Sequence, residues 1–223
     1  MNPGHPVVLI AGGNGALGQS VVPAFARAGR RVVVVDRHVP PVVEGGIGMQ
    51  ADVTDEADIR RVLQDVRHQA GPVEVLVNLV GGFATGRVFE TDMVVWQRML
   101  VTNLTSAFLL SKAVLPEMME RKTGRILHVA ASAAVDPFPG AAAYIVAKSG
   151  LVALIKTLAL ETAGTGVTVN GILPTTIDTP ANRKNMPEAD PSKWAQPDSI
   201  AALLVFLASP ESAQLNGALV PIG

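Results

Sequence analysis

The stretch AGGNGALG, Ala11–Gly18, decides how this chain is expected to fold. The apolar run Val7–Ala11 is typical of a strand buried on both faces, and Leu17–Ala28 has the apolar spacing of a helix ended by Gly29. Glycines at 12, 13, 15 and 18 permit a tight turn and a close approach of the backbone to a pyrophosphate. The free N–H groups of a helix starting near Ala16 would face that charge. The plainer alternative is a tight turn that binds nothing.

Beyond this turn, the chain alternates between buried strands and amphipathic helices. Thr54 is expected to cap the second helix, and Pro116 to break or kink a long helical pattern over Asp92–Arg121. This alternation predicts a single-domain, Rossmann-type, doubly wound parallel α/β sheet covering residues 1–223, with helices on both faces. Further strands are expected at Arg31–Asp36, Ile47–Gln50, Val73–Leu79, Arg125–Ala130, Val167–Ile172 and Ala218–Ile222, and further helices at Tyr144–Ala163 and Asp198–Ala208.

Composition excludes several classes of function. The 223 residues are 48% hydrophobic and carry a formal net charge of −1, so no positive field favours nucleic acid. Cysteine is absent, and the four histidines (His5, His38, His68 and His128) lack ligand spacing, so no metal site is expected. No signal-like segment opens the chain, and no apolar run is expected to reach the roughly 18 residues of a membrane span. We therefore expect a soluble cytoplasmic protein without a membrane partner.

Asp36 gives the glycine-rich turn a chemical meaning. It ends the second strand about 20 residues after the turn, where an acid can bind a ribose 2′-hydroxyl and repel a 2′-phosphate. NAD(H) is therefore the expected cofactor. Arg37 leaves NADP(H) as the alternative, because a neighbouring arginine can pair with the additional phosphate.

Tyr144, the single tyrosine of the chain, precedes Lys148 by four residues. Residues four apart share one helix face. A nearby ammonium is expected to lower the pKa of a phenol from about 10, which suits proton transfer. The pair therefore predicts acid–base chemistry, and an ordinary helix-surface pair is the alternative.

Taken together, these motifs resemble the short-chain dehydrogenase/reductase family over nearly the full length. AGGNGALG resembles the cofactor loop, with Ala11 in the usual threonine position, and Asn78–Gly81 (NLVG) resembles the family's NNAG segment. The resemblance implies that Tyr144 donates or accepts the proton, Lys148 holds the nicotinamide ribose, and Asn103 supports a water relay. The cofactor contacts that it implies are Gly12, Asn14, Gly15, Ala16, Leu17, Gly18, Asp36, Arg37, Asp52, Val53, Asn78, Val80, Gly81, Lys148, Pro174 and Thr176.

The chain departs from the family at the catalytic serine. The position that usually carries this serine is Ala131, and Ser132 follows it. Neighbouring side chains on an extended strand point to opposite faces, so a shift of one residue matters. Either Ser132 serves in place of the missing residue, or it is a solvated loop residue and no serine acts.

Pro174–Pro197 has weak periodicity and is expected to form a substrate lid. The run LPTTIDTPANRKNMPEAD, Leu173–Asp190, resembles the substrate-side loop of dihydropteridine reductases, which also carry alanine at the serine position. Arg183, Lys184 and Asn185 are either substrate contacts or solvated charges. Phe83, Met186 and Trp194 are candidates to cover an aromatic substrate, with core packing as the alternative.

Three interpretations remain open. The first is NADH-dependent reduction of quinonoid dihydropteridine, with Tyr144 as proton donor. The second is a carbonyl or alcohol dehydrogenase acting on a 3-oxo or hydroxy substrate through Ser132, Tyr144 and Lys148. The third is a non-catalytic NAD-binding sensor. The family's usual subunit interface implies a homodimer or homotetramer built on Asp92–Arg121 and Tyr144–Ala163.

Overall fold

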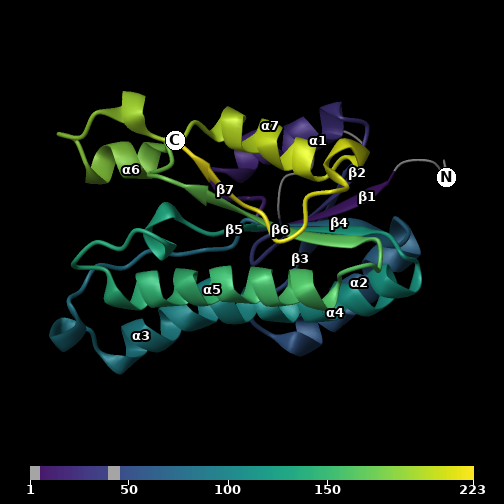
Figure 1. Ribbon diagram of the computed structural model, residues 1–223, viewed down its shortest axis with the longest axis horizontal. Coiled ribbons are helices and arrows are strands. Elements are labelled where there is room, and N and C mark those ends of the chain that lie inside the picture. Colours follow the sequence, from purple (N-terminus) through teal and green to yellow (C-terminus); the bar gives the residue numbers. More distant parts are fainter. Residues whose placement is uncertain (1–5, 40–45) are drawn as a thin grey trace.

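The computed structural model describes residues 6–39 and 46–223, so His5 lies outside the described residues. Its centre is a seven-stranded parallel sheet with the strand order β3-β2-β1-β4-β5-β6-β7 (Figure 1). The bounds of β1, β2 and β3 agree with the sequence-based prediction, and those of the other strands differ from it by one or two residues. The strands are β1 (Val7–Ala11), β2 (Arg31–Asp36), β3 (Ile47–Gln50), β4 (Val73–Asn78), β5 (Gly124–Val129), β6 (Val167–Pro174) and β7 (Leu219–Ile222).

Helices cover both faces of this sheet (Figure 1). On one face, α1 (Gly18–Arg27) and α7 (Pro197–Leu207) pack over side chains such as Val8, Ile10 and Val34. On the other face lie α2 (Glu56–Gln69), α4 (Ser106–Glu120) and α5 (Ala142–Glu161), over a core that includes Leu9, Leu76 and Ile126. Alternate residues of one strand thus feed two separate cores, which explains why the strands are continuously apolar. The expected single-domain, doubly wound α/β fold is confirmed.

The strand order reverses direction between β1 and β4. Ala11 at the end of β1 is paired with both Val35 of β2 and Asn78 of β4. The connection from β1 leads outward to β2 and β3, whereas β4 leads to β5 and the other edge. In open α/β sheets a crevice forms at the carboxyl ends of the strands at such a point. The fold therefore places the turn after β1 and the segment after β4 on opposite walls of one crevice.

Two details of the helices differ from the prediction. Asp55, not Thr54, caps α2, because its carboxylate accepts hydrogen bonds from the N–H groups of Ala57 and Asp58. The pattern over Asp92–Arg121 is not broken at Pro116, which lies inside α4. It is interrupted by a π-helical segment, Val101–Thr105, between α3 (Met93–Leu100) and α4.

Two helical segments are long and apolar, as the sequence predicted over Asp92–Arg121 and Tyr144–Ala163. Met93–Glu120 and Ala142–Glu161 are long and apolar enough to cross a membrane by length and mean composition alone, although polar and charged residues interrupt both of them. The core helix of a soluble protein passes the same test, and the inner stripe of α5, with Leu151 and Ile155, packs into the sheet core. Their composition alone therefore does not assign them to a membrane.

Candidate active site

The turn after β1 is shaped for close backbone approach. Gly12 has a φ of 78°, and a Cβ at this position would lie 3.0 Å from the backbone nitrogen of Val80 on the opposite wall. Leu17, the N-cap of α1, offers no side-chain cap, so no capping side chain covers the N–H groups of the first turn. A wall without side chains beside uncapped N–H groups fits a pyrophosphate. Six of the residues that are expected to contact the cofactor lie in this turn or at the start of α1. They are Gly12, Asn14, Gly15, Ala16, Leu17 and Gly18.

Asp36 is tied to the same turn. Its two carboxylate oxygens accept hydrogen bonds from the backbone N–H groups of Asn14 at 3.1 Å and Arg37 at 2.8 Å. The guanidinium of Arg37 lies 3.6 Å from the carboxylate of Asp52. Hydrogen bonds from Thr54 are the largest cause that lowers the pKa of Asp52 below its ordinary value. Asp36 is thus held against the glycine-rich turn, and Arg37 is paired with an acid.

A cavity of about 630 Å³ opens beside this acidic end, lined by Arg37, Met49, Ala51, Asp52 and other residues. The side chain of Val53 is buried in the core on the α2 face, so of the expected pair Asp52–Val53 only Asp52 lines the cavity.

The opposite wall of the crevice is formed by residues 80–82, here called the Val80–Gly82 strip. Asn103 holds its far end, because Oδ1 accepts from Gly82 N at 3.1 Å and Nδ2 donates to Gly82 O at 3.0 Å. The same Nδ2 donates to Met99 O, an acceptor that a regular helix would use, which accounts for the π-helical segment at Asn103. Both protons of Nδ2 are thus used within the protein, so a water relay through Asn103 would need another of its polar atoms.

The side chain of Asn78 is buried and holds the near end of the strip. Its Oδ1 accepts a hydrogen bond from Val80 N at 3.0 Å. Asn78 was expected to contact the cofactor, but its amide faces the protein interior. The side chain of Asn78 therefore places Val80, and a contact of Asn78 with the cofactor stays a prediction.

Tyr144 and Lys148 lie one turn apart in the first part of α5. Lys148 is buried, its Nζ donates to Val129 O at 2.8 Å, and desolvation lowers its pKa to about 8. The expectation that Lys148 lowers the pKa of the phenol was wrong, because burial raises the pKa of Tyr144 to about 12. Tyr144 is thus a protonated phenol at neutral pH, which suits a proton donor.

Phe83 lies against the catalytic candidate. Its ring meets that of Tyr144 edge to face at 4.9 Å between centroids and an interplanar angle of 76°. Phe83 nevertheless remains 58% exposed. Its ring is therefore accessible, which disagrees with the alternative of core packing, and its contact with a substrate stays a prediction.

Ala131 and Ser132 begin different local structures. Ala131 is extended and buried, whereas Ser132 starts a 3₁₀ turn, Ser132–Ala134. The hydroxyl of Ser132 makes no hydrogen bond to any residue that the structure describes. No contact holds this hydroxyl toward Tyr144.

The lid region is tied at its base and exposed at its tip. Thr176 and Asp178 pair with the backbone of Ala195, and Arg183 forms a bidentate ion pair with Asp178. Arg183 is therefore engaged within the lid. Trp194 is buried and anchors the base, whereas Met186 at the tip is 37% exposed. Pro174 ends β6 at the crevice edge of the sheet.

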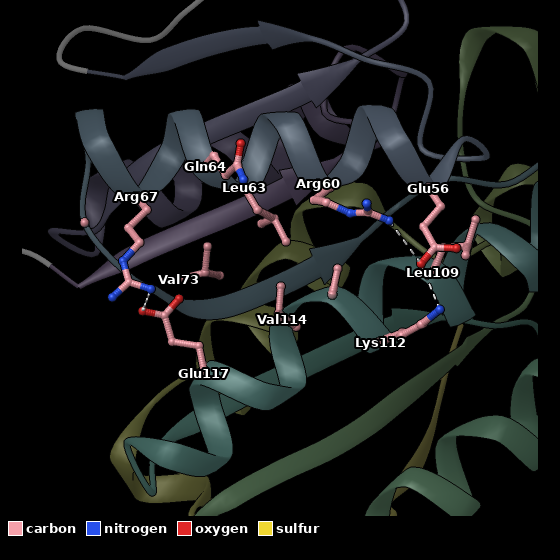
Figure 2. Close-up of a pocket in the computed structure, with 12 residues that line it drawn as sticks. Glu56, Arg60, Leu63, Gln64, Arg67, Val73, Leu109, Lys112, Val114 and Glu117 are labelled. Atoms are coloured by element: carbon pink, nitrogen blue, oxygen red, sulfur yellow. Dashed lines mark hydrogen bonds and ion pairs between the residues drawn. The ribbon is translucent and has the colours of Figure 1, made fainter.

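A second cavity lies away from Tyr144. Figure 2 shows this groove of about 340 Å³ between α2 and α4, with an aliphatic floor that includes Leu63, Val73 and Val114. Its charges satisfy one another: Glu56 pairs with Arg60 and Lys112, and Arg67 pairs with Glu117. Among the residues that the structure describes, no group of three His, Asp or Glu side chains could hold a metal ion.

Behind the crevice lies a buried polar cluster that the sequence did not predict. His128 lies within β5, with Nε2 3.0 Å from Ser111 Oγ and Nδ1 3.4 Å from Asn78 Nδ2. The only signal in the sequence was a titratable residue next to the apolar run Ile126–Leu127 of this strand.

The comparisons with known proteins agree with this geometry. The profile of the short chain dehydrogenase family matches residues 6–190. The chain is 32% identical to 3-oxoacyl-[acyl-carrier-protein] reductase FabG of Vibrio cholerae (97% of this chain, 95% of the relative) and 33% identical to D-threitol dehydrogenase of Mycolicibacterium smegmatis (95% and 89%). The structure of Thermoplasma acidophilum aldohexose dehydrogenase superposes with a TM-score of 0.89 at 25% identity, covering 97% of this chain and 92% of that one. The chain belongs to the short chain dehydrogenase family and is an oxidoreductase.

Proposed function

We propose that this chain is an NAD(P)-dependent carbonyl reductase or alcohol dehydrogenase of a small organic substrate, with Tyr144 as its proton donor. The observation that carries the proposal is a half-buried, protonated phenol one helical turn from a buried lysine, beside the crevice at the carboxyl ends of the strands. The names of the similar proteins, a 3-oxoacyl reductase and a polyol dehydrogenase among them, support this substrate class.

The residues of the crevice fit a nicotinamide dinucleotide. The turn Gly12–Gly18 would receive the pyrophosphate, Asp36 the adenosine ribose, and Lys148 the nicotinamide ribose. When bound, the dinucleotide supplies or accepts a hydride. Asp36 favours NAD(H), because a 2′-phosphate would meet its carboxylate and because Arg37 is paired with Asp52.

Tyr144 is placed to complete the reaction with a proton. In the direction of reduction, its phenol donates a proton to the oxygen that becomes the alcohol, and Phe83 shields the site from one side. In the direction of oxidation the phenolate is required, and the cationic form of Lys148 would stabilise it. The raised pKa of Tyr144 favours the reductive direction at neutral pH.

Ser132 is the open element of this proposal. If Ser132 polarises the carbonyl, Ser132→Ala should lower kcat/KM at least about tenfold, which corresponds to roughly 1.4 kcal/mol. A loss below about twofold would remove Ser132 from the mechanism.

Reduction of quinonoid dihydropteridine is the second candidate. Ala131 places no hydroxyl at the end of β5, and a conjugated, electron-poor ring needs an oxygen clamp less than an isolated carbonyl does. The exposed face of Phe83 beside Tyr144 suits a flat ring. The similarity of the lid sequence Leu173–Asp190 supports the same substrate.

Consumption of NADH and NADPH by the purified chain separates the candidates. The substrates are a 3-oxo ester, a diketone, an aldose and quinonoid dihydropteridine generated in the assay, with an enzyme-free blank. Turnover of a carbonyl that Tyr144→Phe abolishes supports the main proposal, and turnover of the pteridine alone supports the second candidate. Dinucleotide binding without turnover of any substrate would leave a non-catalytic sensor.

We also propose an oligomeric state, a cellular location and a lid for this chain. The outer faces of α4 and α5 expose Phe108, Met119, Val146 and Leu160, which favours a homodimer or homotetramer over a monomer. We propose a cytoplasmic location and a lid formed by residues 174–197.

A further inference from the structure

Four buried or half-buried groups behind the crevice form one directional chain of hydrogen bonds. Ser111 Oγ donates its only proton to Ala107 O at 2.8 Å, so it must accept from His128 Nε2–H at 3.0 Å. His128 Nδ1 is then unprotonated and accepts from Asn78 Nδ2–H at 3.4 Å, the longest link. Asn78 Oδ1 accepts from Val80 N–H. The chain fixes the imidazole as its neutral Nε2–H tautomer.

The environment of His128 keeps this tautomer neutral. The side chain is completely buried, and desolvation followed by the charge of Lys148 lowers its pKa to about 3. Among the described residues, Asn78 Nδ2 has no acceptor other than His128. Removal of this acceptor would therefore leave a buried donor unsatisfied and the Asn78 amide free to rotate.

Rotation of that amide would release the near end of the Val80–Gly82 strip. Val80 packs directly over Gly12, and a Cβ at Gly81 would lie 3.3 Å from Lys148 Nζ. Asn103 secures the far end at Gly82. Asn78 holds the near end, between the pyrophosphate turn and Lys148, beside Leu79, whose N–H donates to Ala11 O at 2.9 Å.

We infer that His128 is a positioning residue, which acts through Asn78 to hold the Val80–Gly82 strip in the place that dinucleotide binding and hydride transfer require. The inference rests on the proposed function. The inference goes beyond the proposed function, because it assigns a role to a buried histidine that is expected to touch neither substrate nor cofactor.

Two amide substitutions of His128 each retain one of the two hydrogen bonds that its ring makes. Asparagine is short and places its amide oxygen near the position of Nδ1, so His128→Asn retains the acceptor for Asn78. Glutamine is longer and places its amide nitrogen near Nε2, so His128→Gln retains the donor to Ser111 and loses the acceptor. Because one net hydrogen bond is worth about 1 kcal/mol, His128→Gln should raise the Kd for NADH about fivefold, with a lower kcat. His128→Asn should stay within about twofold of wild type.

The readouts are titration calorimetry with NADH, kcat and KM for the substrate, and thermal unfolding. Ser212→Ala is the matched control, since it removes a buried hydroxyl that bonds to Leu207 O and Ser209 O in the turn after α7. It should lower the unfolding temperature without changing the Kd. Equal Kd values for both His128 variants, with wild type binding NADH, would overturn this inference alone. A wild type that binds neither NADH nor NADPH would overturn the proposed function as well.

A measurement on the wild type covers the case in which a variant does not fold. Long-range proton–nitrogen correlation spectra of the ¹⁵N-labelled chain should show one histidine as the neutral Nε2–H tautomer, unchanged across mildly acidic and neutral pH. Its ring nitrogen shifts should respond to NADH, because the strip and the ring are linked. A cationic ring, the Nδ1–H tautomer, or no response to bound NADH would contradict the inference.

Discussion

The two walls of the crevice and the proposed lid, residues 174–197, are held in different ways. Backbone and buried amides fix the walls: Gly12 packs on Val80, Asn14 N–H bonds to Asp36, and Asn103 clamps Gly82. The lid is fixed at its base by the backbone of Ala195 and by Trp194, and its outer part is exposed. Rigid walls suit a cofactor of constant shape, and an exposed lid suits a substrate that differs between relatives.

Substitution of Gly12 should give the largest effect on the walls. Gly12→Ala places a side chain at a φ of 78° and 3.0 Å from Val80 N, and we expect the Kd for NADH to rise at least about tenfold, or roughly 1.4 kcal/mol. Gly29→Ala is the matched control, because Gly29 has a φ of 74° and a Cβ there would meet nothing within 4 Å. Titration calorimetry should show an unchanged Kd for the control. Similar Kd values for both variants would mean that the wall at Val80 does not shape the cofactor site.

A smaller effect is expected at the ribose end of the walls. Asp36→Asn removes the charge that opposes a 2′-phosphate, so the ratio of NADPH to NADH affinity should rise about fivefold, or roughly 1 kcal/mol. Asp65→Asn, which removes an acid that lines the cavity beside Arg37 and Asp52, should leave the ratio unchanged. A change in the affinity ratio for both variants, or for neither, would contradict the role of the Asp36 charge in the choice of cofactor.

The expectations from the sequence succeeded where local chemistry decides the structure. Val7–Ala11 and Arg31–Asp36 are continuously apolar because both faces are buried, and this property is visible in the residues alone. The break in the long helix could not be placed, because it depends on Asn103 reaching Gly82, 21 residues away. The pKa of Tyr144 was expected to fall, but burial by elements distant in the sequence raises it.

Low pH should lower the free energy of unfolding of the chain through His128. Its pKa is about 3 in the folded chain against an ordinary 6.5, so the unfolded chain takes up a proton that the folded chain does not. This contribution to stability is fully present above the unfolded value and is lost as the pH falls toward the folded one. Its slope is at most about 1.4 kcal/mol per pH unit. Urea unfolding across this range should give a shallower pH dependence for His128→Asn than for wild type, and identical slopes would show that the ring does not titrate on unfolding.

The smallest effect is expected in the lid. Arg183→Met breaks an ion pair whose arginine is largely exposed, so KM for the substrate should change by no more than about twofold, with the Kd for NADH unchanged. Lys184→Met, an exposed cation next to it, is the control. An increase in KM above about tenfold for Arg183→Met alone would show that Arg183 binds the substrate directly.

The most direct test of the account follows hydride and proton separately. Wild type and Tyr144→Phe are each incubated with NADH carrying deuterium at the transferable position and with a carbonyl substrate that wild type consumes, and the product is analysed by mass spectrometry. We predict that wild type gives a product with one deuterium, and that Tyr144→Phe binds NADH equally well but forms the product at least about 100-fold more slowly. Binding of NADH by wild type without label transfer to any carbonyl, or equal rates for the two proteins, would contradict the proposed chemistry.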